Sequence, residues 1–271
     1  MPFARSILSA ARALGLDVEA FALPIACLGC ARPTRAGAVL CERCRLELRP
    51  MTPPRCGRCG QTLDTWEAGG REGGMAGRER ETAVGMPPVR PSALPPCGFC
   101  RSWPPALAWV ASAVWFEDGP ARRLVHALKY EGWRCAAEPM AEVMQRTVGA
   151  RLREADVLVP VPLGATRRRE RGHNQAEVLA QALGRRTGLP VASGVLVRGR
   201  ETRSQTALAP AARAANVAGA FRGVGRLAPR PVLVDDVLTT GATLAAAAQA
   251  LTAAGAVSIG AVTFARAPKP E

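Results

Sequence analysis

The second half of the chain alternates apolar segments of two kinds. Short runs rich in Val, Leu and Ile predict strands at 109–117, 156–163, 189–198, 231–238 and 257–266. Longer segments with apolar residues at helical spacing predict helices at 120–128, 139–153, 173–188 and 244–254. Strands that alternate with helices predict a parallel α/β sheet, and such sheets bind ligands beyond the carboxyl ends of their strands.

The segment "VLVDDVLTTGAT" (232–243) ends its predicted core strand with two acids. The apolar residues 232–234 require burial, and Asp235 and Asp236 follow where the strand is expected to stop. The turn after them is small and rich in hydroxyls, and it leads into a helix whose first N–H groups and dipole favour phosphate. The acids do not suit a phosphate, but they suit sugar hydroxyls, directly or through Mg²⁺. The segment therefore predicts a site for a phosphorylated ribose.

The first hundred residues contain four C-x-x-C pairs, which are Cys27/Cys30, Cys41/Cys44, Cys56/Cys59 and Cys97/Cys100. One such turn presents two thiolates, which is half of a tetrahedral zinc site. In a chain without an export signal, zinc is favoured over disulfide or redox chemistry, so two structural zinc ions are expected. The spacing fits sequential pairing of the turns and also interleaved pairing. The ninth cysteine, Cys135, is expected to be a small buried residue.

The remaining N-terminal sequence predicts one further element and one insertion. Apolar residues at helical spacing predict an amphipathic helix within 1–24, and Asp17 and Glu19 interrupt any signal-peptide core. The Gly- and Pro-rich stretch 61–96 predicts a mobile insertion within a double zinc-ribbon module at 25–104. A larger domain at 105–267 and a tail at 268–271 follow. No apolar run reaches 18 residues, so we expect a cytoplasmic protein without a membrane span.

Charge points to an anionic partner. The formal net charge is +14, and 34 of the 36 basic residues are Arg, the lysines being Lys129 and Lys269. Residues 151–230 hold fifteen Arg against five acids, a local balance of +10. This is more positive charge than one diphosphate requires, so both phosphorylated ligands and nucleic acid fit the composition.

Several motifs together resemble known families. The segment 232–243 resembles the phosphoribosyl-pyrophosphate (PRPP) signature of type I phosphoribosyltransferases. With "VPVPLGATRRRERGHNQAEVLA" and "RGRETRSQTALAPAARAANVAGAF", downstream of paired C-x-x-C turns, the chain resembles the ComF family of competence proteins. The resemblance covers nearly the whole chain except 61–96 and the end after Arg266. It implies a type I phosphoribosyltransferase-like parallel sheet flanked by helices, a small N-terminal zinc-ribbon module, and a link to DNA uptake in natural transformation.

The resemblance also implies roles for individual residues. Asp235 and Asp236 would contact the ribose hydroxyls, and "HALKYEG" resembles the pyrophosphate loop, so Lys129 would contact the diphosphate. These three residues are the expected catalytic set. The 5-phosphate would be held by Thr239, Thr240, Gly241, Ala242 and Thr243.

The Arg-rich block "RRRERGHNQ" (167–175) follows the strand at 156–163. Arg171, Asn174 and Gln175 match the family block, and Arg171 is expected to contact PRPP. The cluster Arg167–Arg169 suits a pyrophosphate clamp, the steering of nucleic acid, or a solvated helix start. His173 has no partner in the sequence and is not assigned as a base.

A polar stretch between two predicted strands matches the family as well. The matching residues are Thr202, Gln205, Leu208, Arg213, Asn216 and Phe221. It is placed like the flexible loop that closes over the ligand in phosphoribosyltransferases.

Two functions fit these observations. In the first, the protein binds PRPP with Mg²⁺, and an enzyme would transfer the pentosyl group with loss of pyrophosphate. In the second, it is a non-enzymatic, zinc-containing adaptor that binds single-stranded DNA for the competence machinery. The PRPP signature favours the first function, while the zinc ribbons and Arg content favour the second.

Overall fold

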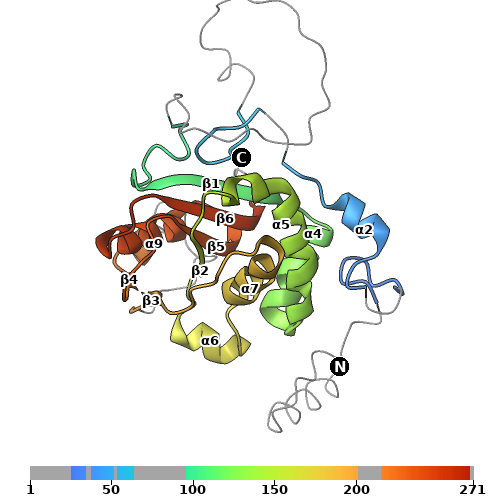
Figure 1. Cartoon of the computed structure of the whole chain (residues 1–271). Helices are drawn as coiled ribbons and strands as arrows, with labels where there is room; N and C mark the ends of the chain where they lie inside the picture. Colours follow the sequence, from blue (N-terminus) through green and yellow to red (C-terminus); the bar gives the residue numbers. More distant parts are fainter. Residues whose placement is uncertain (1–25, 35–37, 52–53, 64–95, 201–214, 269–271) are drawn as a thin grey trace, which may run out of the picture.

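The computed structural model describes residues 26–34, 38–51, 54–63, 96–200 and 215–268 (Figure 1). The strands are β1 (Leu107–Trp115), β2 (Val157–Pro160), β3 (Leu196–Arg198), β4 (Phe221–Gly223), β5 (Pro231–Leu238) and β6 (Ile259–Arg266). The helices are α2 (Glu42–Glu47), α4 (Pro120–His126), α5 (Ala137–Leu152), α6 (Ala165–Arg171), α7 (Gln175–Thr187) and α9 (Ala242–Ala253). A π-helical turn, η2 (Ala127–Glu131), continues α4, and a 3₁₀ turn, η3 (Arg134–Ala136), precedes α5.

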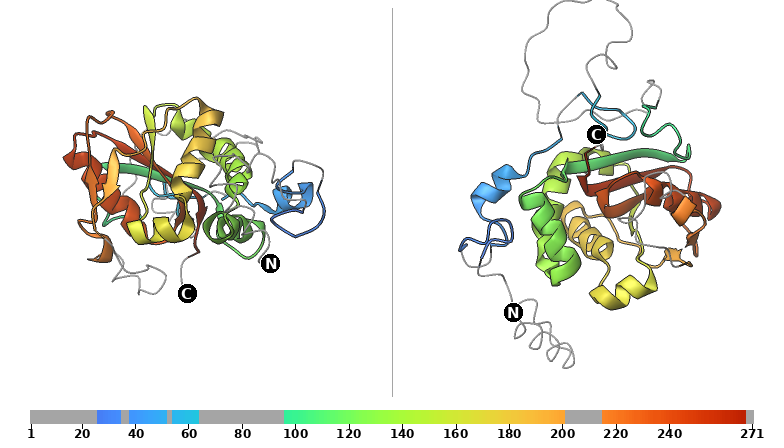
Figure 2. Two further views of the ribbon diagram at one scale, coloured as in Figure 1. Left: turned by 90° about the horizontal axis from the view of Figure 1, so that it is seen from below. Right: turned by 180° about the vertical axis from the view of Figure 1, so that it is seen from behind.

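The centre of the fold is a parallel sheet with the strand order β1-β6-β5-β2. Helices α5 and α7 cover one face and α9 covers the other, so the fold has three layers (Figures 1 and 2). The apolar residues of β5 alternate between the faces: Val232 and Val234 pack toward α5 and α7, and Leu233 packs toward α9. The predicted parallel α/β sheet is confirmed.

Strand β5 is longer than its neighbour β2, so β2 does not cover the edge of β5 at its carboxyl end. The pairing of β5 with β2 ends at Val234 and Pro160, whereas its pairing with β6 continues to Leu238 and Arg266. The strand predicted at 231–238 is confirmed, but the two acids lie within it and do not end it, because β6 supplies partners for Asp235, Val237 and Leu238. The segment 235–238 is paired on the β6 side but extends past the end of β2.

Local start and stop signals explain several helix boundaries. Pro120 begins α4, where a missing N–H costs nothing. The Asn174 side chain caps α7 by accepting a hydrogen bond from the N–H of Ala176 (3.2 Å), and Gly188 ends it at φ +76°. Gly132 ends η2 at φ +77°, a conformation that glycine adopts at low cost.

The strand predicted at 189–198 does not form as one element. Val191 makes a single parallel bridge to Leu158 at the edge of β2, and the chain then turns at Gly194 with φ +97°. Only Leu196–Arg198 is a strand, and it pairs antiparallel with β4 in a separate two-stranded sheet beside α9. A left-handed glycine within an apolar run breaks the extended conformation, so the prediction of a fifth parallel strand was wrong.

The cysteine-rich module packs on both faces of the sheet. Cys27, Cys44 and Leu48 lie in the core beneath α5 and α7, whereas Cys59 and Cys100 lie in the core on the α9 side. Each buried cluster therefore includes residues from one half of the module. Cys135 is half-buried in η3 rather than fully buried, because the short turn leaves one side exposed.

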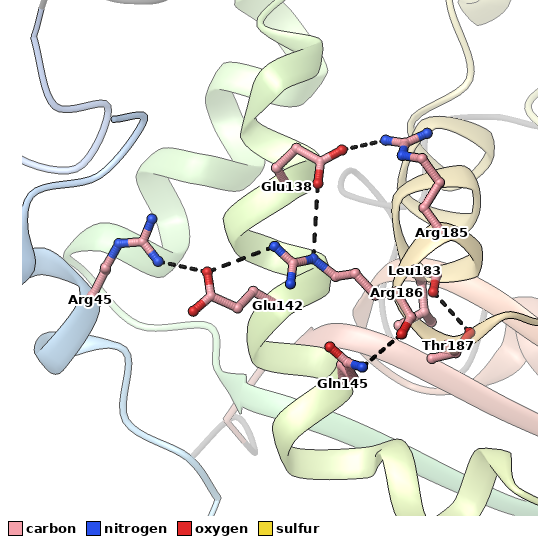
Figure 3. Close-up of polar contacts among 8 residues, drawn as sticks. All are labelled: Arg45, Glu138, Glu142, Gln145, Leu183, Arg185, Arg186 and Thr187. Carbon is pink, nitrogen blue, oxygen red and sulfur yellow. Dashed lines mark hydrogen bonds and ion pairs between the residues drawn. The ribbon is translucent and has the colours of Figure 1, made fainter. Parts of the chain in front are cut away.

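Ion pairs between three elements fix the first half of the module (Figure 3). Arg45 of α2 donates to Glu142 of α5 at 2.6 Å, and Glu142 also lies 4.0 Å from Arg186 of α7. Glu138, one turn earlier on α5, pairs with both Arg186 and Arg185. These pairs are partly exposed, so they define geometry more than they contribute stability.

Some predictions fall on residues outside the described ranges. They are the N-terminal helix within 1–24, most of the insertion at 61–96, the tail at 269–271, and the residues Thr202, Gln205, Leu208 and Arg213. Every helix of the described residues is too short or too polar to cross a membrane.

Candidate functional site

Two groups of four cysteines come together, and the pairing of turns is sequential. Cys27, Cys30, Cys41 and Cys44 form one group, and Cys56, Cys59, Cys97 and Cys100 form the other, with the sulfur atoms of each group within 4.8 Å of one another. The Sγ–Sγ distances are 3.7 Å for Cys30–Cys41, 3.5 Å for Cys59–Cys97 and 3.9 Å for Cys56–Cys100. Four sulfurs at 2.3 Å from one tetrahedral ion would lie about 3.8 Å apart, so both groups fit zinc. None of the nine cysteines forms a disulfide.

The pKa shifts of the thiols in the second cysteine group also suit the binding of a metal cation. The Cys59 thiol donates a hydrogen bond to Cys56, which lowers the pKa of Cys56 to about 4. The same hydrogen bond, together with burial, raises the pKa of Cys59 far above its ordinary value. Backbone N–H groups bond to sulfur as well, for example Gln61 N to Cys59 Sγ at 3.4 Å. Neighbouring thiolates with N–H donors suit a metal ion that replaces the thiol protons.

A cleft of about 470 Å³ lies at the carboxyl end of β5. Its lining includes seven residues predicted as site residues, which are Lys129, Arg171, Asp235, Asp236, Thr239, Gly241 and Thr243. Thr240 and Ala242, predicted with them, do not line the cleft. Residues far apart in sequence therefore meet where β5 extends past β2.

The two acids are neighbours in β5 and line the same cleft, but their surroundings differ. Lys129 forms an ion pair with Asp236, with 2.9 Å between Nζ and Oδ1. The Lys129 side chain is 20% exposed and the Asp236 side chain is 10% exposed. Burial lowers the pKa of Lys129, but the charge of Asp236 and its hydrogen bond outweigh this and raise the pKa above its ordinary value. Lys129 is therefore a fixed cation inside the cleft.

Asp235 has a raised pKa. Burial and the charge of Asp236 raise its pKa to about 7, against the opposing effects of Lys129 and Arg198. Its Oδ1 accepts a hydrogen bond from the N–H of Asp236 at 2.9 Å. A carboxyl group with this pKa gains or loses its proton near neutral pH, so a cation or a hydroxyl donor that enters the cleft will favour the ionised form.

The loop 239–243 connects β5 to α9. Gly241 is the N-cap of α9 at φ +78° and has no side chain to bond the first N–H groups. The Gly241 carbonyl accepts the N–H of Ala245 at 2.9 Å, and Thr240 Oγ1 lies 3.4 Å from the N–H of Ala242. The loop thus presents the amino end of a twelve-residue helix to the cleft, where the dipole favours an anion.

The arginines of the block 167–175 have different surroundings. Arg167 and Arg171, one turn apart on α6, line the cleft, whereas Arg168 pairs with Glu177 at 3.7 Å on the outside. The Arg171 guanidinium lies 4.9 Å from the ring centre of Tyr130 and donates to Gln175 at 2.9 Å.

The residues that follow α6 connect the elements around the cleft by hydrogen bonds. Both ring nitrogens of His173 face carbonyl oxygens, with Leu128 O at 2.8 Å and Arg171 O at 3.0 Å. Asn174 Nδ2 donates to Val161 O at 3.1 Å. His173 and Asn174 therefore connect η2, the end of β2 and α7.

Sequence reasoning missed other residues of the lining. Arg198 of β3 lines the cleft and lowers the pKa of Asp235 by its charge. Phe116, Arg122, His126 and Tyr130 line the side formed by β1, α4 and η2. The "HALKYEG" motif contains His126 and Tyr130 and could have identified them, but no local pattern singles out Arg198.

Comparisons with known proteins match two families to separate parts of the chain. The family described as double zinc ribbon domain matches residues 19–76, and the family described as phosphoribosyl transferase domain matches residues 151–271. The chain is 35% identical over 183 residues to DNA utilization protein YhgH of Salmonella typhimurium, covering 65% of this chain and 78% of that protein. It is 26% identical over 216 residues to Competence protein F of Haemophilus influenzae, covering 76% and 80%.

One solved structure resembles the chain at lower similarity. The crystal structure of orotate phosphoribosyltransferase from Aeropyrum pernix aligns with a TM-score of 0.30 and 21% identity, over 52% of this chain and 62% of that one, less than two thirds of its length.

The parallel sheet, the loop at the end of β5 and the two cysteine groups define a phosphoribosyltransferase-like domain that carries a double zinc ribbon. Relatives of the chain are named for DNA utilization and competence. The chain belongs to the ComF family.

Proposed function

We propose that the cleft binds PRPP together with Mg²⁺ and supports displacement of pyrophosphate at the anomeric carbon by a nucleophilic acceptor, whose new bond to that carbon replaces the bond to the leaving pyrophosphate. The observation that carries this proposal is the convergence of Asp235, Asp236, Lys129 and loop 239–243 on one 470 Å³ cleft. The acids would hold the ribose hydroxyls, and loop 239–243 would hold the 5-phosphate at the amino end of α9. Lys129 would contact the diphosphate.

The chain's own charges suit the departure of pyrophosphate from the anomeric carbon. Negative charge develops on the diphosphate as the bond to carbon breaks, and the ribose becomes like an oxocarbenium ion. Lys129, Arg167 and Arg171 line the same cleft and would stabilise the diphosphate, while the acids would fix the ring. Fixed charges in a partly buried cleft stabilise a transition state more than mobile charges in water do.

Magnesium fits the donor set, because Mg²⁺ prefers carboxylate oxygens and shares its remaining positions with phosphate oxygens and water. Asp235 and Asp236 are the residues that would hold it, directly or through the sugar. When bound, the ion would neutralise part of the diphosphate charge.

Thermal unfolding with PRPP and Mg²⁺ tests the proposal. We expect PRPP with Mg²⁺ to raise the Tm of the full chain, by about 3 kcal/mol of added stability at a hundredfold excess over Kd. The double variant Asp235→Asn/Asp236→Asn should lose this increase. The pair Arg222→Gln/Arg226→Gln, which removes two charges from the exposed part of the β3–β4 region outside the cleft, should keep it. An equal increase in the aspartate variant would contradict the proposal.

A second function, binding of single-stranded DNA, is favoured by a separate observation. A hollow of about 620 Å³ lies between the cysteine-rich module and the ends of α5 and α7, and its lining includes Arg55, Arg146, Arg153 and Arg186. Arg146 and Arg153 are exposed. Four guanidinium groups around one hollow suit phosphates of a nucleic acid backbone, and the relatives' names refer to DNA utilization.

The salt dependence of binding tests this second function. The logarithm of affinity should fall with the logarithm of salt concentration, with a slope of about 0.7 for each phosphate contacted. Arg146→Gln/Arg153→Gln should reduce the slope by about 1.4, whereas Arg222→Gln/Arg226→Gln should leave it unchanged. Equal effects of both pairs would show that net charge, and not the hollow, attracts DNA.

A further inference from the structure

The second zinc ribbon touches the predicted binding loop through one tryptophan. Trp103 lies three residues after Cys100, the last cysteine of the second group, and the backbone N–H of Trp103 donates to the Cys100 carbonyl at 3.1 Å. The side chain is 6% exposed and belongs to the buried cluster that includes Cys59, Cys100 and Leu244. Trp103 is thus packed between the cysteine group and the first turn of α9.

The contact partner of Trp103 is Gly241, the N-cap of α9. A Cβ on Gly241 would lie 2.3 Å from Cζ2 and 2.6 Å from Cε2 of the indole, closer than carbon atoms can approach. Gly241 also has φ +78°, which disfavours any other residue. The glycine therefore permits both the turn of the loop and the close approach of the indole. Because the indole lies directly against the backbone of loop 239–243, it limits how far that backbone can shift.

Trp103 is itself held firmly by the ribbon. Arg58, between two cysteines of the second group, donates to the carbonyls of Cys100 (3.0 Å), Trp103 (3.2 Å) and Pro104 (2.7 Å). Arg266 at the end of β6 is 1% exposed and donates to the Cys59 carbonyl at 2.7 Å. Hydrogen bonds join the ribbon, the end of the sheet and Trp103 into one unit. If the ribbon lost its fold, it would no longer hold the indole against loop 239–243.

We propose that Trp103 is a positioning residue through which the second zinc ribbon holds loop 239–243 in its phosphate-binding form. The inference rests on the proposed function, in which this loop binds the 5-phosphate. Its consequence is a coupling of two affinities: zinc held in the second ribbon tightens phosphate binding, and a bound phosphate tightens the binding of that zinc, which we expect to observe as slower zinc release. Coupling between two sites is reciprocal by thermodynamic necessity.

The chain contains a matched control for Trp103. Trp109 of β1 lies over Gly260 of β6 in the same way, with Cζ2 2.3 Å from the position of a Cβ. Gly260 lies near the start of its strand and lines a different hollow from loop 239–243. Replacing either tryptophan removes an indole from a glycine, but only Trp103 contacts the loop.

Calorimetric titration of the zinc-loaded full chain with two ligands tests the role of Trp103. Ribose 5-phosphate reports on loop 239–243, and inorganic pyrophosphate reports on the Lys129 side of the cleft. We expect Trp103→Leu to weaken ribose 5-phosphate about tenfold and pyrophosphate less than twofold, with most of the affinity restored in Trp103→Phe. Trp109→Leu should change neither affinity. Equal losses for both ligands, or equal effects of the two leucine variants, would overturn the proposal.

Zinc release from the wild-type chain provides a second readout that needs no variant to fold. Transfer of zinc to a coloured chelator should show two phases, and ribose 5-phosphate should slow only one of them. In Trp103→Leu the ligand effect should decrease, whereas Trp103→Phe should keep most of it. Release unaffected by bound ribose 5-phosphate would overturn the coupling while leaving the proposed function intact. Failure of the wild-type chain to bind either ribose 5-phosphate or PRPP would overturn both.

Discussion

The ion pair between Lys129 and Asp236 allows a quantitative test of the cleft's electrostatics. Lys129 Nζ lies 2.9 Å from Asp236 Oδ1, and the side chains of Lys129 and Asp236 are 20% and 10% exposed respectively. Lys129→Met keeps the length of the side chain but leaves Asp236 buried without its cation, next to Asp235. Removing one partner of a buried pair costs about 3–5 kcal/mol, and the residual exposure favours the lower end, about 3 kcal/mol. For a chain of this size that corresponds to a fall in Tm of about 6–12 °C.

A double-mutant cycle separates the ion pair from simple loss of packing. Urea unfolding should show that Lys129→Met loses about 3 kcal/mol, whereas Lys129→Met/Asp236→Asn regains most of it, because the amide carries no charge to be left unpaired. The regain identifies the charge of Asp236 as the cause. A loss below 1 kcal/mol for Lys129→Met would refute the reasoning, as would a double variant no more stable than the single one.

Two further predictions follow from the same structure. The pKa of Asp235 is raised from 3.8 to about 7, so the folded state binds this proton more tightly than the unfolded state, and the resulting penalty is absent below about pH 4 and grows until about pH 7. Asp235→Asn should therefore raise the Tm of the ligand-free chain at pH 8 more than at pH 5, and equal changes at the two pH values would contradict the assignment. Elemental analysis should find two zinc ions per chain, one for each cysteine group, and chelation should lower the Tm by several degrees because zinc affinity contributes to folding; a metal-free chain with unchanged Tm would contradict a structural role.

Features encoded in contiguous segments were predictable from the sequence. The C-x-x-C turns, the strand at 231–238 and the caps Asn174 and Gly188 depend on residues a few positions apart, so local pattern and chemistry suffice. The sequential pairing of the cysteine turns was not predictable, because both arrangements satisfy the spacing. The structure decides it by bringing the sulfur atoms of the first two turns together in one group and those of the last two turns together in the other.

Features that depend on tertiary contacts could not be predicted from the sequence. Arg198 comes from a segment read as a continuation of a parallel strand, and only the turn at Gly194 and the antiparallel pairing with β4 place it at the cleft. The division between Arg167 and Arg168 depends on how α6 packs. The approach of Trp103 to Gly241 joins residues 138 positions apart through a close contact, and no periodicity or motif reports such a contact.

The central claim is that Asp235, Asp236 and loop 239–243 together hold a phosphorylated ribose. A crystal structure of the chain with PRPP and Mg²⁺ tests it most directly. The account predicts the 5-phosphate against the N–H groups of loop 239–243, the ribose hydroxyls at the two acids, and the diphosphate near Lys129. Ligand density in another part of the molecule, or a cleft that stays empty at saturating PRPP, would contradict the account.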